Sequence, residues 1–293
     1  MEPNIVSLID NEKNGHQVIG AISFQGDGMI FHGSLLHDFD LLILVVCCDI
    51  GRSSQIQIEH CMLGKQHYQL LYVGRNDIKQ WVIEGQNREI VQCFLHGDVI
   101  LDKDKKLASL RQDLLDFGSE MREQRKLNEY ARLLNTFVKA KKYTQENDLM
   151  DAYYCVLQAL KHYARIELIE QGILPESSVW EQVRPINSVA YKLFDELTDN
   201  KETLEQRIQL VLLASEFSVM SKMEDCCSLL LELLGSRKSA WSIQELVEIP
   251  ELIHIKAELP MMLRKLVYRS LVTEVTIELN GVQGDVREIR YLA

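Results

Sequence analysis

Hydrophobic positions in the first hundred residues follow the pattern of β-strands. His16 to Phe24 is apolar and β-branched, and the run that follows Asp40 and ends at Cys47 is continuously apolar. A continuous run is expected of a central strand that is buried on both faces. Gln55 to Leu63 alternates polar and apolar residues, and a short turn connects it to His67 to Val73. These segments predict a small sheet that contains a hairpin.

The pattern changes to helical spacing between about Ser119 and Leu234. Apolar residues keep a three-to-four-residue spacing from Asp148 to Glu170, and Gly172 followed by Pro175 gives this helix a stop signal. Thr203 to Leu234 is a further helical stretch. The central part of the chain is therefore predicted to be an α-helical bundle.

Helix-start signals and a final hairpin organise the rest of the chain. Ser178 to Glu181 and Ser242 to Glu245 match capping boxes, in which serine and glutamate satisfy each other's backbone N–H groups. Pro260 stands where the first turn of a helix favours proline. Leu271 to Leu279 and Val286 to Leu292 then read as two strands. Short helices followed by a hairpin are the outline of a winged helix.

These patterns predict an α+β fold with three domains. Residues 1–118 form a mixed sheet with flanking helices, residues 119–235 form the helical bundle, and residues 236–293 form a winged-helix-like module. A length of 293 residues suits two or three domains.

The charge distribution limits the partners that we expect. The net charge is −11. Lys/Arg and Asp/Glu number 10 and 16 in the first predicted domain, 14 and 19 in the second, and 8 and 8 in the third. No domain has the basic excess of a strong nucleic-acid binder. The candidate recognition helix offers only Arg264, Lys265 and Arg269. We expect weak or absent DNA binding, and favour a protein-contact role for the module.

Cysteine usage and hydropathy indicate a cytoplasmic location. Seven cysteines include the adjacent pairs Cys47-Cys48 and Cys226-Cys227, and no CxxC spacing occurs. This pattern favours reduced thiols over a disulfide framework. No apolar run approaches the roughly 20 residues of a membrane span, and the N-terminus does not resemble a signal peptide. We therefore expect no membrane association.

The candidate chemistry centres on Asp38 and Asp40. Strand side chains repeat every second residue, so two aspartates one residue apart project to the same side. Paired carboxylates can hold Mg²⁺, which prefers oxygen ligands and keeps waters and substrate phosphates. Phosphoryl transfer needs such neutralisation of phosphate charge. The alternative interpretation is that both aspartates are turn residues that cap the entry to the strand.

Asp38 to Val46 resembles the metal-binding strand of the DNA polymerase β-type nucleotidyltransferase superfamily, where Gly-Ser precedes Asp-x-Asp. Gly33 and Ser34 precede Asp38, with three residues between them where that superfamily has about ten. The resemblance implies that Gly33 and Ser34 bind a nucleotide phosphate. The short gap favours the alternative that they belong to an unrelated loop.

Leu95 to Asp102, followed by Lys105 to Phe117, resembles the segment that leads into the helical bundle of aminoglycoside nucleotidyltransferases. As a whole, the chain is similar to a bacterial nucleotidyltransferase-like family found mainly in Gram-positive bacteria. The resemblance implies Mg²⁺ and a nucleoside triphosphate as ligands, and a homodimer that uses the bundle as its interface.

The resemblance also implies a third carboxylate on a neighbouring strand and a general base from the bundle. The matching strand position is Gln69, an amide, and Glu59 on the partner strand is the nearby acidic substitute. No base can be assigned between Glu129 and Lys142. Two metals that share two carboxylates would lack ligands, so the catalytic set is incomplete.

Two functions follow from these observations. The leading one is a nucleotidyltransferase-like protein with Mg²⁺-dependent nucleotide binding, and weak or no nucleotidyl transfer to a hydroxyl acceptor. Its catalytic candidates are Asp38, Asp40 and Glu59. The alternative is a catalytically inactive regulatory protein whose winged helix contacts DNA or a partner protein.

Overall fold

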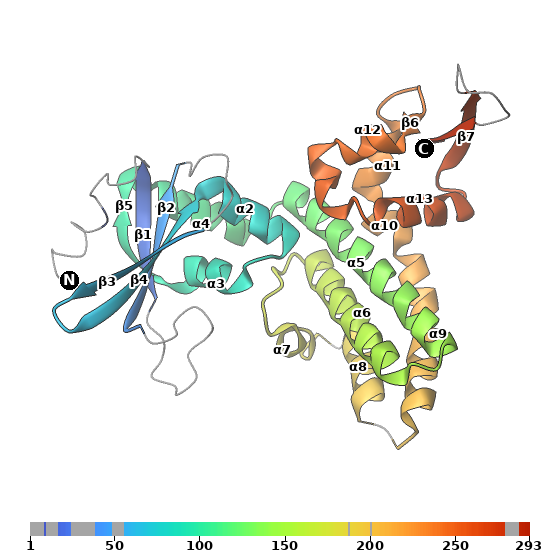
Figure 1. Cartoon of the computed structure of the whole chain (residues 1–293), viewed down its shortest axis with the longest axis horizontal. Helices are drawn as coiled ribbons and strands as arrows, with labels where there is room; N and C mark the ends of the chain where they lie inside the picture. The colour runs from blue at the N-terminus through green and yellow to red at the C-terminus, as the bar shows by residue number, and fades with distance from the viewer. Residues whose placement is uncertain are drawn as a thin grey trace. The chain divides into compact units, whose positions relative to one another are not determined.

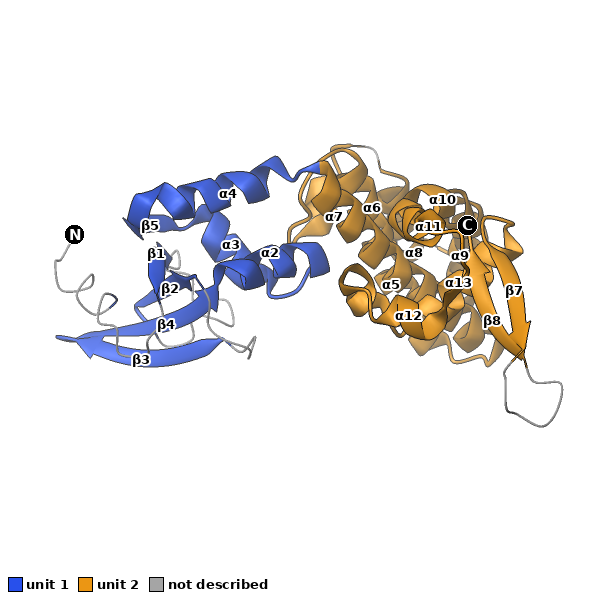
Figure 2. Ribbon diagram, turned by 90° about the horizontal axis from the view of Figure 1, so that it is seen from above, with its two compact units in different colours: residues 1–118 blue, residues 119–293 orange. Residues whose placement is uncertain are grey.

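The computed structural model describes residues 9, 17–24, 39–48, 56–186, 188–199, 201–278 and 287–293. The chain divides into two compact units, residues 1–118 and residues 119–293 (Figures 1 and 2). The predicted bundle and the predicted C-terminal module therefore belong to one unit. A single cluster of buried hydrophobic side chains, from Leu127 to Tyr291, runs through both of them.

The first unit contains a sheet and helices that follow its strands. In chain order, its described elements are β1 (Val18–Phe24), β2 (Leu41–Cys47), β3 (Gln57–Leu63), β4 (Gln66–Gly74), α2 (Arg75–Glu84), α3 (Arg88–His96), β5 (Asp98–Asp102), the 3₁₀ turn η1 (Lys103–Lys105) and α4 (Lys106–Asp116).

The sheet is mixed, as the sequence predicts. Its strand order is β3-β4-β2-β1-β5. β2 and β4 are parallel, and the other neighbours are antiparallel. β2 is central and its residues from Leu42 to Cys47 are at most 2% exposed, which confirms the prediction of a strand buried on both faces. The predicted hairpin is also confirmed, because β3 and β4 pair in antiparallel register.

Carboxylates fix the starts of two helices in the first unit. Asp77 accepts a hydrogen bond from the backbone N–H of Gly74 at 3.2 Å, where α2 begins. Asp102 accepts hydrogen bonds from the backbone N–H groups of Leu107 and Ala108, at 2.9 and 3.0 Å, and so satisfies the start of α4. α4 packs closely on β1, since a Cβ atom at Gly20 would lie 2.4 Å from the side chain of Leu107.

The second unit is mainly helical and ends in a small sheet. In chain order, its described elements are α5 (Ser119–Gln145), α6 (Leu149–Glu170), α7 (Val179–Val183), α8 (Val189–Thr198), α9 (Leu204–Ser221), α10 (Met223–Cys226), α11 (Ser228–Gly235), β6 (Trp241–Ser242), α12 (Ile243–Val247), the 3₁₀ helix η2 (Pro250–Ile255), α13 (Leu259–Tyr268), β7 (Thr273–Glu278) and β8 (Arg287–Leu292).

The two predicted capping boxes have different outcomes. Ser242 and Glu245 form theirs: the serine hydroxyl accepts from the N–H of Glu245 at 3.2 Å, and the glutamate accepts from the N–H of Ser242 at 2.8 Å. The box at Ser178 is wrong, because the Ser178 side chain makes no capping hydrogen bond. The N–H of Glu181 donates instead to the backbone carbonyl of Ser178 at 3.1 Å.

The C-terminal elements have the predicted order of short helices followed by a hairpin. β8 pairs with both β6 and β7 in a sheet of order β6-β8-β7. Among the residues that the structure describes, no helix combines the length and apolar character that crossing a membrane requires.

Candidate functional site

Asp40 lies directly before β2 and is held against the start of β4. Its backbone N–H donates to the carbonyl oxygen of His67 at 2.9 Å, and its Oδ2 accepts from the N–H of His67 at 2.7 Å. The Asp40 side chain is 55% exposed. Its other oxygen, Oδ1, has no hydrogen-bond partner among the described residues. A carboxylate whose side chain is half exposed can be reached by a ligand.

Asp38, Gly33 and Ser34 lie outside the described residues, so their predicted roles stay predictions. The Asp40 carboxylate has the chemistry that Mg²⁺ requires, because this ion is commonly held by one or two carboxylates together with waters and phosphates. An exposed carboxylate with one oxygen already fixed by a backbone N–H is oriented for such a contact. Asp40 alone supplies too few ligands for two metals.

The strand register separates Gln69 from Glu59. Gln69 pairs with Leu42 of β2 and with His60 of β3, whereas Glu59 pairs with Leu70. Successive side chains of a strand point to opposite faces of the sheet. Glu59 therefore lies on the face opposite Gln69, and it does not replace the carboxylate that is expected at the Gln69 position.

Glu59 has a different partner on its own face. It accepts a hydrogen bond from the hydroxyl of Tyr72 at 3.2 Å. Burial and then the negative charge of Glu59 raise the pKa of the Tyr72 hydroxyl to about 12. Both effects favour the protonated phenol, so Tyr72 stays a donor to Glu59 at neutral pH.

Glu129 is the one carboxylate in the bundle segment 129–142, where the resemblance implies a general base. It is fully buried. Its Oε1 lies 2.7 Å from the guanidinium of Arg125, and its Oε2 lies 2.6 Å from Nδ1 of His162 and 3.6 Å from Arg165. We call these four residues the buried ion cluster. It joins α5 to α6.

The burial and ion pairing of Glu129 exclude it as a base. Burial alone would raise the pKa of Glu129, but Arg125, His162 and Arg165 together lower it far below its usual value. Burial lowers the pKa of His162, although its hydrogen bond to Glu129 opposes this shift. A base must reach the proton that it abstracts, and a fully buried carboxylate with both oxygens against basic side chains cannot reach a substrate hydroxyl. The buried ion cluster is therefore a structural link between α5 and α6.

The sequence holds a signal for this cluster that periodicity alone does not reveal. Arg125 and Glu129 stand four residues apart among buried apolar positions of α5, and His162 and Arg165 stand three apart on α6. Residues at these spacings share one helix face, and Arg125 and Glu129 carry opposite charges. When that face is also the apolar one, a buried ion pair is expected.

In the described part of the chain, one cluster of three side chains has ligand atoms close enough together to hold a metal ion. Ligand atoms of Glu170, Asp225 and Cys226 lie within 4.8 Å of one another. Lys222 donates to both oxygens of Glu170 at 2.7 Å, and Lys126 donates to Asp225 at 3.0 Å. Burial raises the pKa of the Cys226 thiol well above its ordinary value. Two ammonium groups and a neutral thiol leave no role for a cation here.

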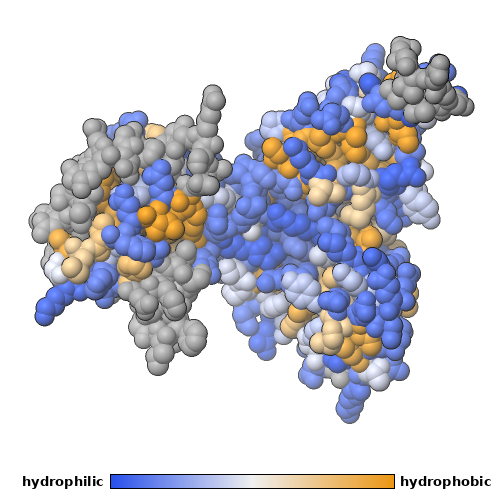
Figure 3. All heavy atoms as spheres, in the orientation of Figure 1, coloured by the Kyte–Doolittle hydropathy of each residue, from blue (hydrophilic) through white to orange (hydrophobic). Residues whose placement is uncertain are grey.

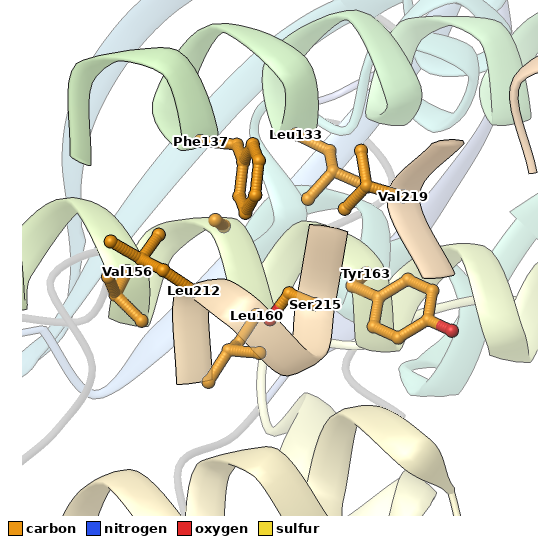
Figure 4. Close-up of a pocket in the computed structure, with 9 residues that line it drawn as sticks. Leu133, Phe137, Val156, Leu160, Tyr163, Leu212, Ser215 and Val219 are labelled. Carbon is orange, nitrogen blue, oxygen red and sulfur yellow. The ribbon is translucent and has the colours of Figure 1, made fainter. Parts of the chain in front are cut away.

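The interior of the bundle contains a small apolar cavity between α5, α6 and α9 (Figure 4). Its lining includes Phe137, Leu160, Tyr163 and Leu212, and its volume is about 10 Å³. One water molecule needs roughly this space and several polar partners. Ser215 also lines the cavity, and its hydroxyl donates to the carbonyl of Val211. The cavity is too small for an organic substrate.

The C-terminal module neutralises much of its own positive charge. Three of its basic residues form ion pairs within the module: Arg237 with Glu245, Arg264 with Glu274, and Arg290 with Glu288. Apolar surface gathers on the same module (Figure 3). Its exposed apolar side chains are Ile243, Ile253, Tyr268, Val275, Ile277 and Ile289.

Three family models match consecutive parts of the chain. Residues 3–122 match a model described as nucleotidyltransferase-like, residues 123–222 match a YgxA-like substrate binding domain, and residues 228–288 match a helix-turn-helix domain. The last match confirms the predicted helical module at the C-terminus.

Similar proteins are known by sequence and by structure. The chain is 34% identical over 248 residues to the Bacillus subtilis (strain 168) protein YgxA, which is described as uncharacterized; the match covers 85% of this chain and 83% of that protein. A crystal structure of a nucleotidyltransferase-like protein from Exiguobacterium sibiricum 255-15 is 29% identical, with a TM-score of 0.81, and the match covers 94% of this chain and 93% of that one. The chain belongs to the nucleotidyltransferase-like family that includes YgxA, and it carries a C-terminal helix-turn-helix domain.

Proposed function

We propose that the first unit binds a nucleoside triphosphate together with Mg²⁺ at Asp40, and that it transfers the nucleotide weakly or not at all. Asp38 is the second carboxylate of this proposed site, and Gly33 and Ser34 are its candidate phosphate contacts. The observation that carries the proposal is the carboxylate of Asp40, whose side chain is 55% exposed and has one oxygen fixed by the backbone N–H of His67 in β4.

The missing groups support binding without efficient turnover. Gln69 is neutral where the resemblance implies a third carboxylate, and Glu59 lies on the opposite face of the sheet from Gln69. Glu129 is buried in an ion cluster and cannot act as a base. The described residues of the bundle segment 129–142 therefore offer no general base. Such a base contributes about 10²–10⁴-fold to the rate of an active transferase.

Thermal unfolding tests the binding proposal. Each of the four nucleoside triphosphates is added with Mg²⁺ to the full chain. A ligand at a hundredfold excess over its Kd stabilises the native state by about 2.7 kcal/mol. We expect at least one triphosphate to raise the Tm of the wild-type protein and to leave Asp40→Asn unchanged.

Asp116→Asn is the matched control, because Asp116 is an aspartate in α4 of the same unit. This variant should respond to the triphosphate like the wild type. An absent response in the wild type, or an equal response in Asp40→Asn, contradicts the proposal.

The activity part is tested by incorporation of a labelled nucleotide into aminoglycosides and other small alcohols. We expect little or no incorporation. Efficient transfer that Glu59→Gln abolishes would overturn the assignment of a weakened centre, since that result requires Glu59 to act at the reacting atoms.

The second candidate is a regulatory role through the helix-turn-helix domain, in contact with a partner protein. The internal ion pairs of this module favour it, because an arginine already paired with glutamate contributes little to phosphate binding. Its exposed Tyr268 and β7 side chains are typical of a protein-binding surface. Sub-micromolar binding to random duplex DNA at physiological salt would show this candidate to be wrong.

A further inference from the structure

A polar cavity lies at the end of the first unit's sheet that is remote from Asp40. Its volume is about 240 Å³. Its charged and polar lining residues lie at the start of α2, in η1 and on α4: Arg75, Asp104, Lys105, Lys106, Ser109 and Asp113.

The strand register fixes the position of this cavity relative to Asp40. Gly20 pairs with Val46 of β2 and with Asp102 of β5, and Cys47 at the end of β2 pairs with Gly74 of β4. The residues that line the cavity therefore gather where β2 ends. Asp40 precedes the start of β2, and a strand of this length spans about 20 Å. The cavity and the Asp40 site are separate.

Two cations at this cavity have no acidic partner among the residues that the structure describes. Lys106 is paired with Asp104 at 3.1 Å, and Asp113 lies 3.7 Å from Lys79. Arg75 and Lys105 form no ion pair with any residue that the structure describes. This local excess of positive charge stands in a unit that has 10 basic and 16 acidic residues. The positive charge at the cavity is therefore opposite in sign to the net charge of the unit.

The same cations stand where helix dipoles disfavour them. Arg75 is the first residue of α2, and Lys105 is the N-cap of α4. The N-terminus of a helix carries a partial positive charge, so a cation there is unfavourable. An anion in the cavity would relieve this repulsion.

The backbone of α4 does not serve as the anion site. Asp102 already accepts hydrogen bonds from the N–H groups of Leu107 and Ala108. Binding would therefore depend on the side chains of Arg75 and Lys105, with the hydroxyl of Ser109 as a further donor. A guanidinium presents a planar fork of donors that matches phosphate oxygens.

We propose that this cavity binds a phosphate group, supplied either by inorganic phosphate or pyrophosphate or by a small phosphate ester. A phosphate carries a charge of about −1.5 to −2 at neutral pH. Its charge therefore matches Arg75 and Lys105, which lack an ion pair in the described part of the chain, better than the single charge of a carboxylate does. The proposal is independent of nucleotide binding at Asp40.

Isothermal titration of the full chain in low-salt buffer without divalent ions tests the proposal. Pyrophosphate and ribose 5-phosphate are the probes, and the tighter binder identifies the source of the phosphate. Because charge-assisted hydrogen bonds from both cations are lost, we expect Arg75→Gln/Lys105→Gln to weaken binding about tenfold or more. Asp40→Asn should bind like the wild type, which separates this site from the one proposed above.

Lys65→Gln is the charge control, since Lys65 lies in the β3–β4 turn at the other end of the sheet. It should retain wild-type affinity. No binding of either probe to the wild type, or equal affinities of the double variant and Lys65→Gln, overturns the proposal.

Thermal unfolding without added anion gives an independent measurement. The double variant should melt no lower than the wild type, because it removes cations that the helix dipoles disfavour. A lower Tm in that buffer would mean that Arg75 and Lys105 stabilise the fold by themselves, and it would also overturn the proposal.

Discussion

Asp40 in the first unit and Glu129 in the second are carboxylates in opposite environments. Asp40 is 55% exposed, and one of its oxygens has no partner among the described residues. Glu129 is fully buried between Arg125, Arg165 and His162. The exposed carboxylate is accessible to a ligand. The buried carboxylate instead forms ion pairs that link α5 to α6. The difference shows why a carboxylate in the expected segment of the bundle is not a base.

The largest effect is expected from Glu129→Gln. This change leaves two buried guanidinium groups without their counter-ion. Removal of one partner from a buried ion pair typically costs about 3–5 kcal/mol. The free energy of unfolding of the second unit, measured by urea denaturation and helical circular dichroism, should fall by that amount.

Glu146→Gln is the matched control on the same helix. Glu146 lies 3.7 Å from Lys142 in an exposed pair, and exposed pairs contribute about 0–1 kcal/mol. Equal losses in the two variants would contradict the distinction between buried and exposed carboxylates.

A smaller effect is expected from pH. The pKa values of both His162 and Glu129 are lower in the folded state than their ordinary values of 6.5 and 4.5. The unfolded state therefore binds more protons, and stability is lost as the pH falls below about 6.5 and further below about 4.5. Urea denaturation at a series of pH values should show this decline. His162→Gln should remove its upper part, and an unchanged slope in that variant would contradict the assignment.

A still smaller effect is expected from Glu59→Gln. The loss of its carboxylate should lower the pKa of Tyr72 from about 12 towards the ordinary value of 10, but not fully to it, because burial is the main cause of the shift. Stability should change by about 0.5–1.5 kcal/mol, the contribution of one hydrogen bond. Titration of ¹³C-labelled tyrosine by NMR measures the pKa. A value unmoved by the substitution would place Glu59 away from Tyr72.

Local patterns predicted most of the fold. The continuous apolar run after Asp40 became the buried strand β2, and the alternation from Gln55 to Leu63 became β3 of the hairpin. Ser242 and Glu245 formed the predicted capping box. The box at Ser178 failed because the same residue types can also close a backbone turn, a choice that depends on tertiary context.

The candidate site was less predictable. Asp40 was identified from its position before an apolar strand, which is a local feature. The separation of Glu59 from Gln69 depends on the register between β3 and β4, and a slip of one residue would reverse it. Arg125 lies on the same helix as Glu129, but His162 and Arg165 lie on α6, so these two partners become evident only when α5 and α6 are placed side by side.

The central claim is that the Asp40 carboxylate holds a metal–nucleotide complex. Mn²⁺ can replace Mg²⁺ at oxygen ligands, and the water-proton relaxation rate of an Mn²⁺–triphosphate complex rises when the complex is bound to a protein. We predict that the wild-type chain enhances this relaxation with at least one of the four triphosphates, that Glu59→Gln does so equally, and that Asp40→Asn does not. Asp40→Asn should lose no more than about 1.5 kcal/mol, the contribution of one hydrogen bond, because the asparagine oxygen can still accept from the N–H of His67. No enhancement by the wild type, or equal enhancement by Asp40→Asn, would contradict the claim.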